Sequence, residues 1–259
     1  MTLRELLCNH NRSQIEEWTR ARARTAYVGD AVLCRILGSH NMYVDPKNYD
    51  MAPWLMLDGL WEMWVGMAIG RAIQPGWVCL DVGAWCGYYS VLMAELVGPT
   101  GKVWAYEPNQ KHYELCQRSL LANGHTWTYC WNVAVGGENK NAKFLLTDGG
   151  GSRLHNEGTK TTLVRTIDHE DYQRVDLIKM DIEGGERDAW DGMQSTIERN
   201  PNIIIVMEWE PMRYNDAENF AKMIAAKFPL REITTDGLTT NITNDDLLKP
   251  VMRNLWLQQ

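Results

Sequence analysis

The chain has 259 residues and a formal net charge of -7, from 26 lysines and arginines against 33 aspartates and glutamates. Hydrophobic residues make up 45% and charged residues 23%, which excludes a disordered or fibrous protein and is typical of a globular one. The length suits one large α/β domain, and the acidic balance argues against a nucleic-acid partner.

The cysteines and the apolar stretches predict a reducing location without a membrane span. No two of the six cysteines form a C-x-x-C pair, so we expect no zinc site and assign no metal ligand. The N-terminal residues contain no long apolar stretch, and the most apolar stretch, 51–73, contains Asp58, Glu62 and Arg71. We therefore expect a cytoplasmic protein with no secretory signal.

The first 74 residues predict an N-terminal extension of helices and one hairpin. Apolar periodicity predicts helices over 2–24 and 52–73, and two short apolar runs, 31–37 and 41–44, predict strands joined by a turn. The first 24 residues could support a homodimer, although no feature selects that over packing within one chain.

Residues 75–259 form the second predicted unit, in which short apolar strands alternate with helices. This alternation predicts a doubly wound, mostly parallel α/β sheet. The helices are expected at 88–97, 110–123, 186–199 and 217–227. The strands are expected at 77–82, 102–106, 126–135, 176–180, 203–207, 230–234 and 251–257, and the last two could pair as an antiparallel hairpin at the sheet edge.

One segment, 136–170, interrupts this alternation. It contains Gly149-Gly150-Gly151-Ser152 and two apolar runs, and we expect an inserted hairpin with a mobile loop of the kind that often covers a site. His155 lies in this segment.

A glycine-containing loop follows the predicted strand 77–82 and opens the next helix. Its sequence is Asp81-Val82-Gly83-Ala84-Trp85-Cys86-Gly87. Glycines allow a ligand to approach the backbone closely, and a helix N-terminus attracts an anionic group. The next strand ends in Glu107, where a carboxylate can accept hydrogen bonds from both hydroxyls of a ribose. Together they predict a cofactor that contains a nucleoside.

The spacing of the loop favours S-adenosylmethionine over NAD as that cofactor. Gly83 and Gly87 are four residues apart, which does not fit the G-x-G-x-x-G fingerprint of dinucleotide binding. An acid at position 81 suits an ammonium better than a diphosphate. An NAD-dependent reductase is the more distant alternative, and a glycine turn without a ligand would not explain Glu107.

Carboxylates also follow the next two predicted strands. Asp181 and Glu183 end the strand 176–180, and both could face one side if the strand continued through them. Glu186 would cap the following helix, and Glu208 ends the strand 203–207. Such a cluster can orient an amine, act as a general base, or bind a hard divalent cation, and the cation is the less favoured of the three.

From about Met42 to Trp209 the sequence resembles the FkbM-type S-adenosylmethionine-dependent methyltransferases. The most specific shared element runs from Ile178 to Glu186, whereas the glycine loop is common to methyltransferases at large. The other shared elements are Gly59-x-x-Glu62, Pro75-Gly76, Tyr106-Glu107-Pro108-Asn109, Asn132-Val133-Ala134-Val135-Gly136 and Thr166-Ile167-Asp168. One departure is Trp85, because the family usually has asparagine there.

The resemblance implies a class I methyltransferase (Rossmann-like) fold with a seven-stranded sheet and an antiparallel edge hairpin. It implies methyl transfer to oxygen, commonly a hydroxyl of a sugar or small metabolite. The implied cofactor contacts are Asp81, Gly83, Ala84, Gly87 and Tyr88 near the methionine, Glu107 on the ribose, and Asn132, Val133 and Ala134 around the adenine. Glu62 and Asp181 would reach the amino group.

A hydroxyl becomes a good nucleophile only when its proton leaves, so a general base is expected near the cofactor. Asp181 is the first candidate, followed by Glu208 and Glu183, with His155 as an alternative. Three tryptophans adjoin these residues and could stack on the sulfonium or on a sugar, namely Trp61, Trp85 and Trp209. The alternative to an O-methyltransferase is a cofactor-binding scaffold without catalysis of its own.

Overall fold

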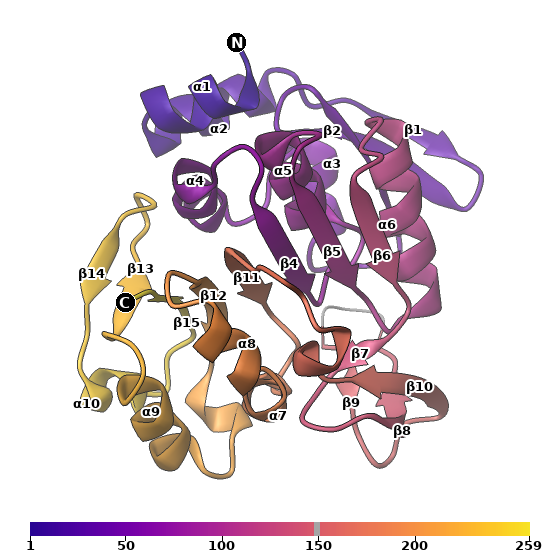
Figure 1. Ribbon diagram of the computed structural model, residues 1–259. Helices are drawn as coiled ribbons and strands as arrows, with labels where there is room; N and C mark the ends of the chain where they lie inside the picture. Colours follow the sequence, from indigo (N-terminus) through magenta and orange to yellow (C-terminus); the bar gives the residue numbers. More distant parts are fainter. Residues whose placement is uncertain (148–150) are drawn as a thin grey trace.

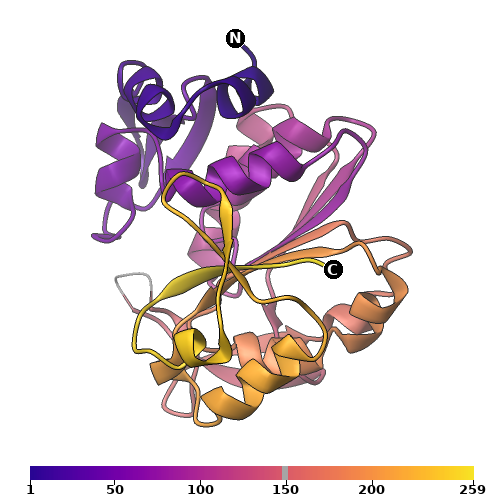
Figure 2. The same cartoon turned by 90° about the vertical axis from the view of Figure 1, so that its left-hand side faces the viewer.

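The structure is a computed structural model that describes residues 1–147 and 151–259. A twisted eight-stranded sheet crosses the molecule, and helices cover both of its faces (Figures 1 and 2). Its strands lie in the order β14 (Thr239–Asn241), β13 (Arg231–Ile233), β15 (Arg253–Leu257), β12 (Ile204–Trp209), β11 (Leu177–Met180), β4 (Val78–Val82), β5 (Lys102–Tyr106) and β6 (Thr128–Trp131).

The pairing within this sheet confirms the predicted class I architecture. The five strands from β12 to β6 run parallel to one another, whereas β15 pairs antiparallel with both β12 and β13. The expected edge hairpin is therefore not a direct one, because β14 and the short helix α10 (Asn244–Leu247) separate β13 from β15. The additional strand β14 brings the total to eight rather than the expected seven.

Each central strand is buried on both faces, as its unbroken apolar sequence requires. Successive residues such as Cys79 and Leu80 of β4 enter two different hydrophobic clusters. One cluster lies under α4 (Met63–Ala72), α5 (Tyr88–Val97) and α6 (Gln110–Ala122), and the other under α7 (Glu186–Asp191), α8 (Gln194–Arg199) and α9 (Ala217–Ala225).

The N-terminal segment consists of two helices and a small antiparallel sheet. The single helix expected over 2–24 is α1 (Leu3–Asn9) followed by α2 (Arg12–Arg20), because Thr2 and Asn11 each form a capping box and start a separate helix. The sheet contains β1 (Thr25–Val28), β2 (Ala31–Ile36) and β3 (His40–Val44), of which β1 was not expected. Leu6 of α1 and Leu92 of α5 belong to one hydrophobic cluster.

The helix expected over 52–73 is also two helices, α3 (Ala52–Leu57) and α4. The chain turns between them through two residues in the left-handed region, Gly59 with φ +68° and Glu62 with φ +37°. The predicted helix 186–199 similarly divides into α7 and α8, at Gly192. At both turns a glycine, Gly59 or Gly192, lies against the backbone of a residue that is distant in the sequence. The local spacing of apolar residues cannot predict such contacts.

The predicted insert 136–170, together with the two residues before it, forms a second sheet beside the main one. Its order is β7 (Ala134–Val135), β10 (Lys160–Arg165), β8 (Lys140–Leu145) and β9 (Arg153–Leu154), and β8 and β10 form the expected antiparallel pair. The strand expected over 126–135 ends early because the Asn132 amide donates hydrogen bonds to the carbonyls of Glu107 and Pro108. The predicted mobile loop falls on Gly149 and Gly150, which lie outside the described residues.

Two 3₁₀ helices complete the chain, η1 (Ile167–Glu170) after β10 and η2 (Pro211–Arg213) after β12. Among the described residues, no helix combines the length and the apolar character needed to cross a membrane.

We predict that Gly59→Ala destabilises the protein more than Gly98→Ala does. Both glycines have a positive φ, +68° and +64°, so a side chain is strained at either position. A Cβ at position 59 would lie 2.6 Å from the Arg35 carbonyl oxygen, whereas nothing lies within 4 Å at position 98. We expect about 1 kcal/mol for Gly98→Ala and about 1–3 kcal/mol more for Gly59→Ala, measured by urea unfolding. Equal losses would contradict the close contact.

Candidate functional site

A cavity of about 760 Å³ opens where β4, β5 and β11 end. Gly83, Glu107 and Asp181 follow these three strands and all line it. The chain order of the strands reverses between β4 and β11, which is where open α/β sheets bind ligands. The insert forms part of the wall through Phe144 and His155.

The glycine loop is fitted tightly against the turn that follows β11. Gly83 has φ +85°, and a Cβ there would lie 1.9 Å from the carbonyl oxygen of Asp181. Only glycine fits this approach, and the Gly83 backbone also lines the cavity. Gly87 has φ +93° and allows close packing with α6, because a Cβ there would lie 2.9 Å from Cys116 Sγ.

Trp85 shows why the family's usual asparagine would suit this position. Its φ is +48°, in the left-handed region that asparagine adopts readily and bulky residues rarely do. The indole lines the cavity and meets His112 edge-on, with ring centroids 5.7 Å apart. Its Nε1–H is buried and has no hydrogen-bond partner among the described residues, so a donor is available at the wall.

Glu107 is held in place by two backbone groups. Its Oε2 accepts from the Trp85 N–H at 2.8 Å and its Oε1 accepts from the Asn109 N–H at 2.8 Å. Each oxygen retains a lone pair for a further donor such as a ribose hydroxyl. Burial raises the pKa of Glu107 to about 7, although the two N–H groups partly oppose this rise.

The expected cofactor residues divide into wall residues and residues behind the wall. Those that line the cavity are Gly83, Ala84, Tyr88, Glu107, Val133, Ala134 and Asp181. Behind the wall lie Gly87 and three polar residues that bind their neighbours. The Asn132 amide holds the β5 end, the Glu62 carboxylate accepts from Tyr89 Oη at 2.9 Å, and Asp81 accepts from Ser90 Oγ at 2.5 Å.

Asp81 also carries an acceptor that the described residues leave unused. Its Oδ1 is buried without a hydrogen-bond partner among them, and burial raises its pKa to about 6. This orphaned oxygen, the glycine cradle and the Glu107 carboxylate together fit the amine, the backbone approach and the ribose of S-adenosylmethionine.

A buried lysine that sequence reasoning missed organises the acidic side of the cavity. Lys179 Nζ lies 2.8 Å from Asp181 Oδ2 and 4.7 Å from the centre of the Tyr89 ring. Burial opposes ionisation of Asp181, but the Lys179 charge outweighs it and holds the pKa of Asp181 below its ordinary value. Asp181 is therefore a carboxylate at neutral pH. In the sequence, only the presence of a lysine within an apolar strand could have indicated this ion pair.

Asp181, Glu183 and Glu208 do come together, with carboxylate oxygens that all lie within 4.8 Å of one another. They do not meet on one face of a continuing strand, as expected, because β11 ends at Met180. The backbone instead turns at Glu183, whose φ is +59°. Burial and the Asp181 charge raise the pKa of Glu183 to about 7 and that of Glu208 to about 9.

Arg213 of η2 is a second cation that the sequence did not predict. Its guanidinium contacts Glu183 Oε2 at 3.0 Å and Glu208 Oε2 at 2.5 Å. Glu186 stabilises the turn that contains Glu183. Its buried carboxylate accepts hydrogen bonds from the N–H groups of Ile182 and Gly184 at 2.8 and 2.9 Å. The acidic turn is thus fixed by hydrogen bonds and by a protein cation.

The remaining expected residues have separate positions. His155 lines the cavity from the insert, and Trp61 and Trp85 line it too. The expectation for Trp209 was wrong, because its side chain is fully buried and packs against Tyr214. The side chains of consecutive strand residues point to opposite faces, so Glu208 reaches the acidic cluster while Trp209 enters the core.

The fold, with its glycine turn at the point where the strand order reverses, defines a class I, Rossmann-like methyltransferase domain. The sequence model of the methyltransferase FkbM domain matches residues 81–227, more than half of the chain. The chain therefore belongs to the FkbM family of S-adenosylmethionine-dependent methyltransferases, as the resemblance predicted.

Curated relatives match over shorter stretches. A ubiquinone/menaquinone biosynthesis C-methyltransferase of Burkholderia multivorans is 33% identical over 79 residues, which are 30% of this chain and 32% of that protein. A protein-L-isoaspartate O-methyltransferase of Methanothrix thermoacetophila is 42% identical over 48 residues, 18% of this chain and 23% of that protein. The matches thus span about a third or less of these relatives.

Two solved structures align with much of this chain at low identity. The methyltransferase FkbM of Methylobacillus flagellatus KT is 18% identical, with a TM-score of 0.48 over 72% of this chain and 46% of that one. A protein of Pyrococcus horikoshii described as a transferase is 11% identical, with a TM-score of 0.50 over 89% of this chain and 71% of that one.

We predict that Lys179→Met destabilises the protein by about 3–5 kcal/mol at neutral pH, because it leaves the partly buried Asp181 carboxylate without its cation. In the variant the folded-state pKa of Asp181 rises above its unfolded value, so the folded protein binds more protons and the loss grows as pH rises. Urea unfolding at about pH 5 and about pH 8 measures both effects. The control is Lys102→Met, at an exposed position on β5, which should cost no more than about 0.5 kcal/mol. Equal losses for the two variants would contradict this role.

Proposed function

We propose that this chain is an S-adenosylmethionine-dependent O-methyltransferase whose acceptor is a hydroxyl of a carbohydrate or another small molecule. The observation that carries the proposal is the Asp181 carboxylate, which lines the cavity, is kept ionised by Lys179 and touches the glycine loop through its own backbone. A base at this position can take a proton from an acceptor beside the cofactor.

When bound, S-adenosylmethionine supplies a methyl group on a sulfonium for in-line displacement by the acceptor. Glu107 would accept hydrogen bonds from the ribose, and Val133 and Ala134 would flank the adenine. The methionine part would lie against the Gly83 backbone, and Asp81 and Glu62, just behind the wall, would attract its amino group. These residues hold and align the cofactor, which is most of what this reaction asks of a protein.

The choice among bases follows from the charges around them. Asp181 is ionised at neutral pH and is the proposed base. Glu183 also lines the cavity and would be about half ionised near pH 7, so it is second, while Glu208 stays largely protonated. Arg213 already contacts both Glu183 and Glu208, so we propose that the acidic cluster works without a divalent cation.

We predict that Asp181→Asn lowers turnover by about 10²- to 10⁴-fold while the binding of S-adenosylhomocysteine changes far less. The amide keeps the shape of the side chain but cannot accept the proton. Transfer of labelled methyl from S-adenosylmethionine to a panel of sugars and other hydroxyl compounds measures turnover, and calorimetry measures binding. With Asp181 as base the rate of the parent protein stays flat above about pH 5, whereas with Glu183 it falls below about pH 7. If the parent protein binds the cofactor but transfers methyl to no acceptor, it is a cofactor-binding scaffold and the proposal is wrong.

We also predict that binding of S-adenosylhomocysteine weakens as pH falls from about 8 to about 6, by up to about tenfold. The raised pKa of Glu107 means that its carboxyl is protonated below about pH 7, and a protonated carboxyl accepts ribose hydroxyls poorly. Glu107→Gln should bind more weakly and with little dependence on pH. The exposed Glu138→Gln should behave like the parent protein. A parent affinity that is constant over this range would contradict the ribose role.

A further inference from the structure

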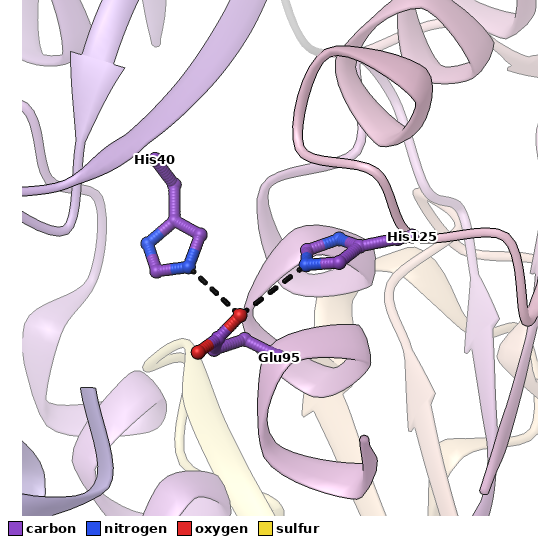
Figure 3. A group of neighbouring side chains, drawn as sticks. All are labelled: His40, Glu95 and His125. Atoms are coloured by element: carbon purple, nitrogen blue, oxygen red, sulfur yellow. Dashed lines mark hydrogen bonds and ion pairs between the residues drawn. The ribbon is translucent and has the colours of Figure 1, made fainter. Parts of the chain in front are cut away.

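Two histidines and a glutamate meet at the end of α5 that lies away from the glycine loop (Figure 3). His40 begins β3 in the N-terminal sheet, Glu95 lies in the last turn of α5, and His125 lies between α6 and β6. The Nε2 atoms of the two imidazoles point at one carboxylate oxygen, Glu95 Oε2, from different sides. None of the three lines the cofactor cavity.

Two of the three distances between these atoms match those between ligands of a small cation. Glu95 Oε2 lies 3.2 Å from His40 Nε2 and 3.4 Å from His125 Nε2. Hydrogen bonds of this type are usually near 2.9 Å. Zinc binds nitrogen and oxygen at about 2.0–2.1 Å, and the edge of the corresponding tetrahedron is about 3.3 Å. All three ligand atoms lie within 4.8 Å of one another.

The types of ligand also suit a cation of this class. Both histidines are buried, whereas the Glu95 side chain is partly open to solvent. Two imidazole nitrogens and one carboxylate oxygen form a donor set that suits zinc-like ions and not magnesium, which prefers oxygen alone.

The surroundings hold the ligands in position. Ser39 Oγ lies 3.2 Å from His40 Nδ1, an outer hydrogen bond that orients the ring. The His125 ring packs against Trp127, whose indole N–H donates to the carbonyl of Ala94 beside Glu95. The Glu95 side chain is 41% exposed, so a cation can enter from solvent and keep a water as its fourth ligand.

We propose that His40 Nε2, Glu95 Oε2 and His125 Nε2 form a binding site for a divalent cation of the zinc class. The cation would join three segments that are distant in the sequence, namely the N-terminal sheet, α5 and the turn before β6. Its role is to hold the N-terminal sheet onto the methyltransferase core, and it takes no part in methyl transfer.

The test uses the full chain after treatment with a chelator. Titration with Zn²⁺ in a calorimeter should show one tight site, and Zn²⁺ at about 100 times its Kd should raise Tm by about 5 °C. Mg²⁺ at the same concentration should leave Tm unchanged. Co²⁺ should give the visible absorption of a four-coordinate nitrogen and oxygen site. Absence of a Zn²⁺ site in the parent protein would overturn the proposal.

Variants locate the site. Glu95→Gln and His125→Gln should each weaken Zn²⁺ binding by about 100-fold or more. His169→Gln and Cys8→Ser, which change an exposed histidine and an exposed thiol, are the matched controls and should bind as the parent does. If His125→Gln fails to fold, Glu95→Gln still decides, because its side chain is partly exposed. Retained affinity in Glu95→Gln, or its loss in Cys8→Ser, would overturn the assignment.

Discussion

The ion pair between Lys179 and Asp181 is the interaction on which the rest of the site depends. A cavity floor formed by buried strand ends is a poor place for charge, and carboxylates there would otherwise take up protons. A lysine inside β11 changes this, because its ammonium compensates Asp181 directly and faces the ring of Tyr89. Arg213 contacts Glu183 and Glu208, although burial and the Asp181 charge keep the pKa of both raised. The acidity of the cleft is thus balanced by two cations within the protein.

The sequence could predict the parts of the fold and the site that follow from local patterns. Buried apolar runs indicated the parallel strands, and the glycine loop, Glu107 and the acids near the ends of β11 and β12 indicated the edge of the sheet where a cavity lies. Lys179 was missed because a single lysine does not alter the pattern of an apolar strand. Arg213 was missed because its contacts depend on the path of the chain after β12.

The errors in the predicted elements have a common physical cause, which is that tertiary contacts decided the local conformation. The break between α3 and α4 exists because the chain approaches the Arg35 carbonyl at Gly59. Asn132 ends β6 because its amide binds the end of β5. Asp81 was the right type of residue, but it lies behind the cavity wall rather than at it. His40, Glu95 and His125 are far apart in the sequence and form no local motif, so only the folded chain brings them together.

The position of β15 has a consequence for the order in which the sheet can be completed. This strand lies between β12 and β13, although it follows both in the sequence. Until residues 253–257 have left the ribosome, the apolar strand β12 presents an unpaired edge that could join another chain. We therefore expect the nascent protein to depend on chaperones, and a truncation before Arg253 to aggregate rather than to yield a smaller folded domain.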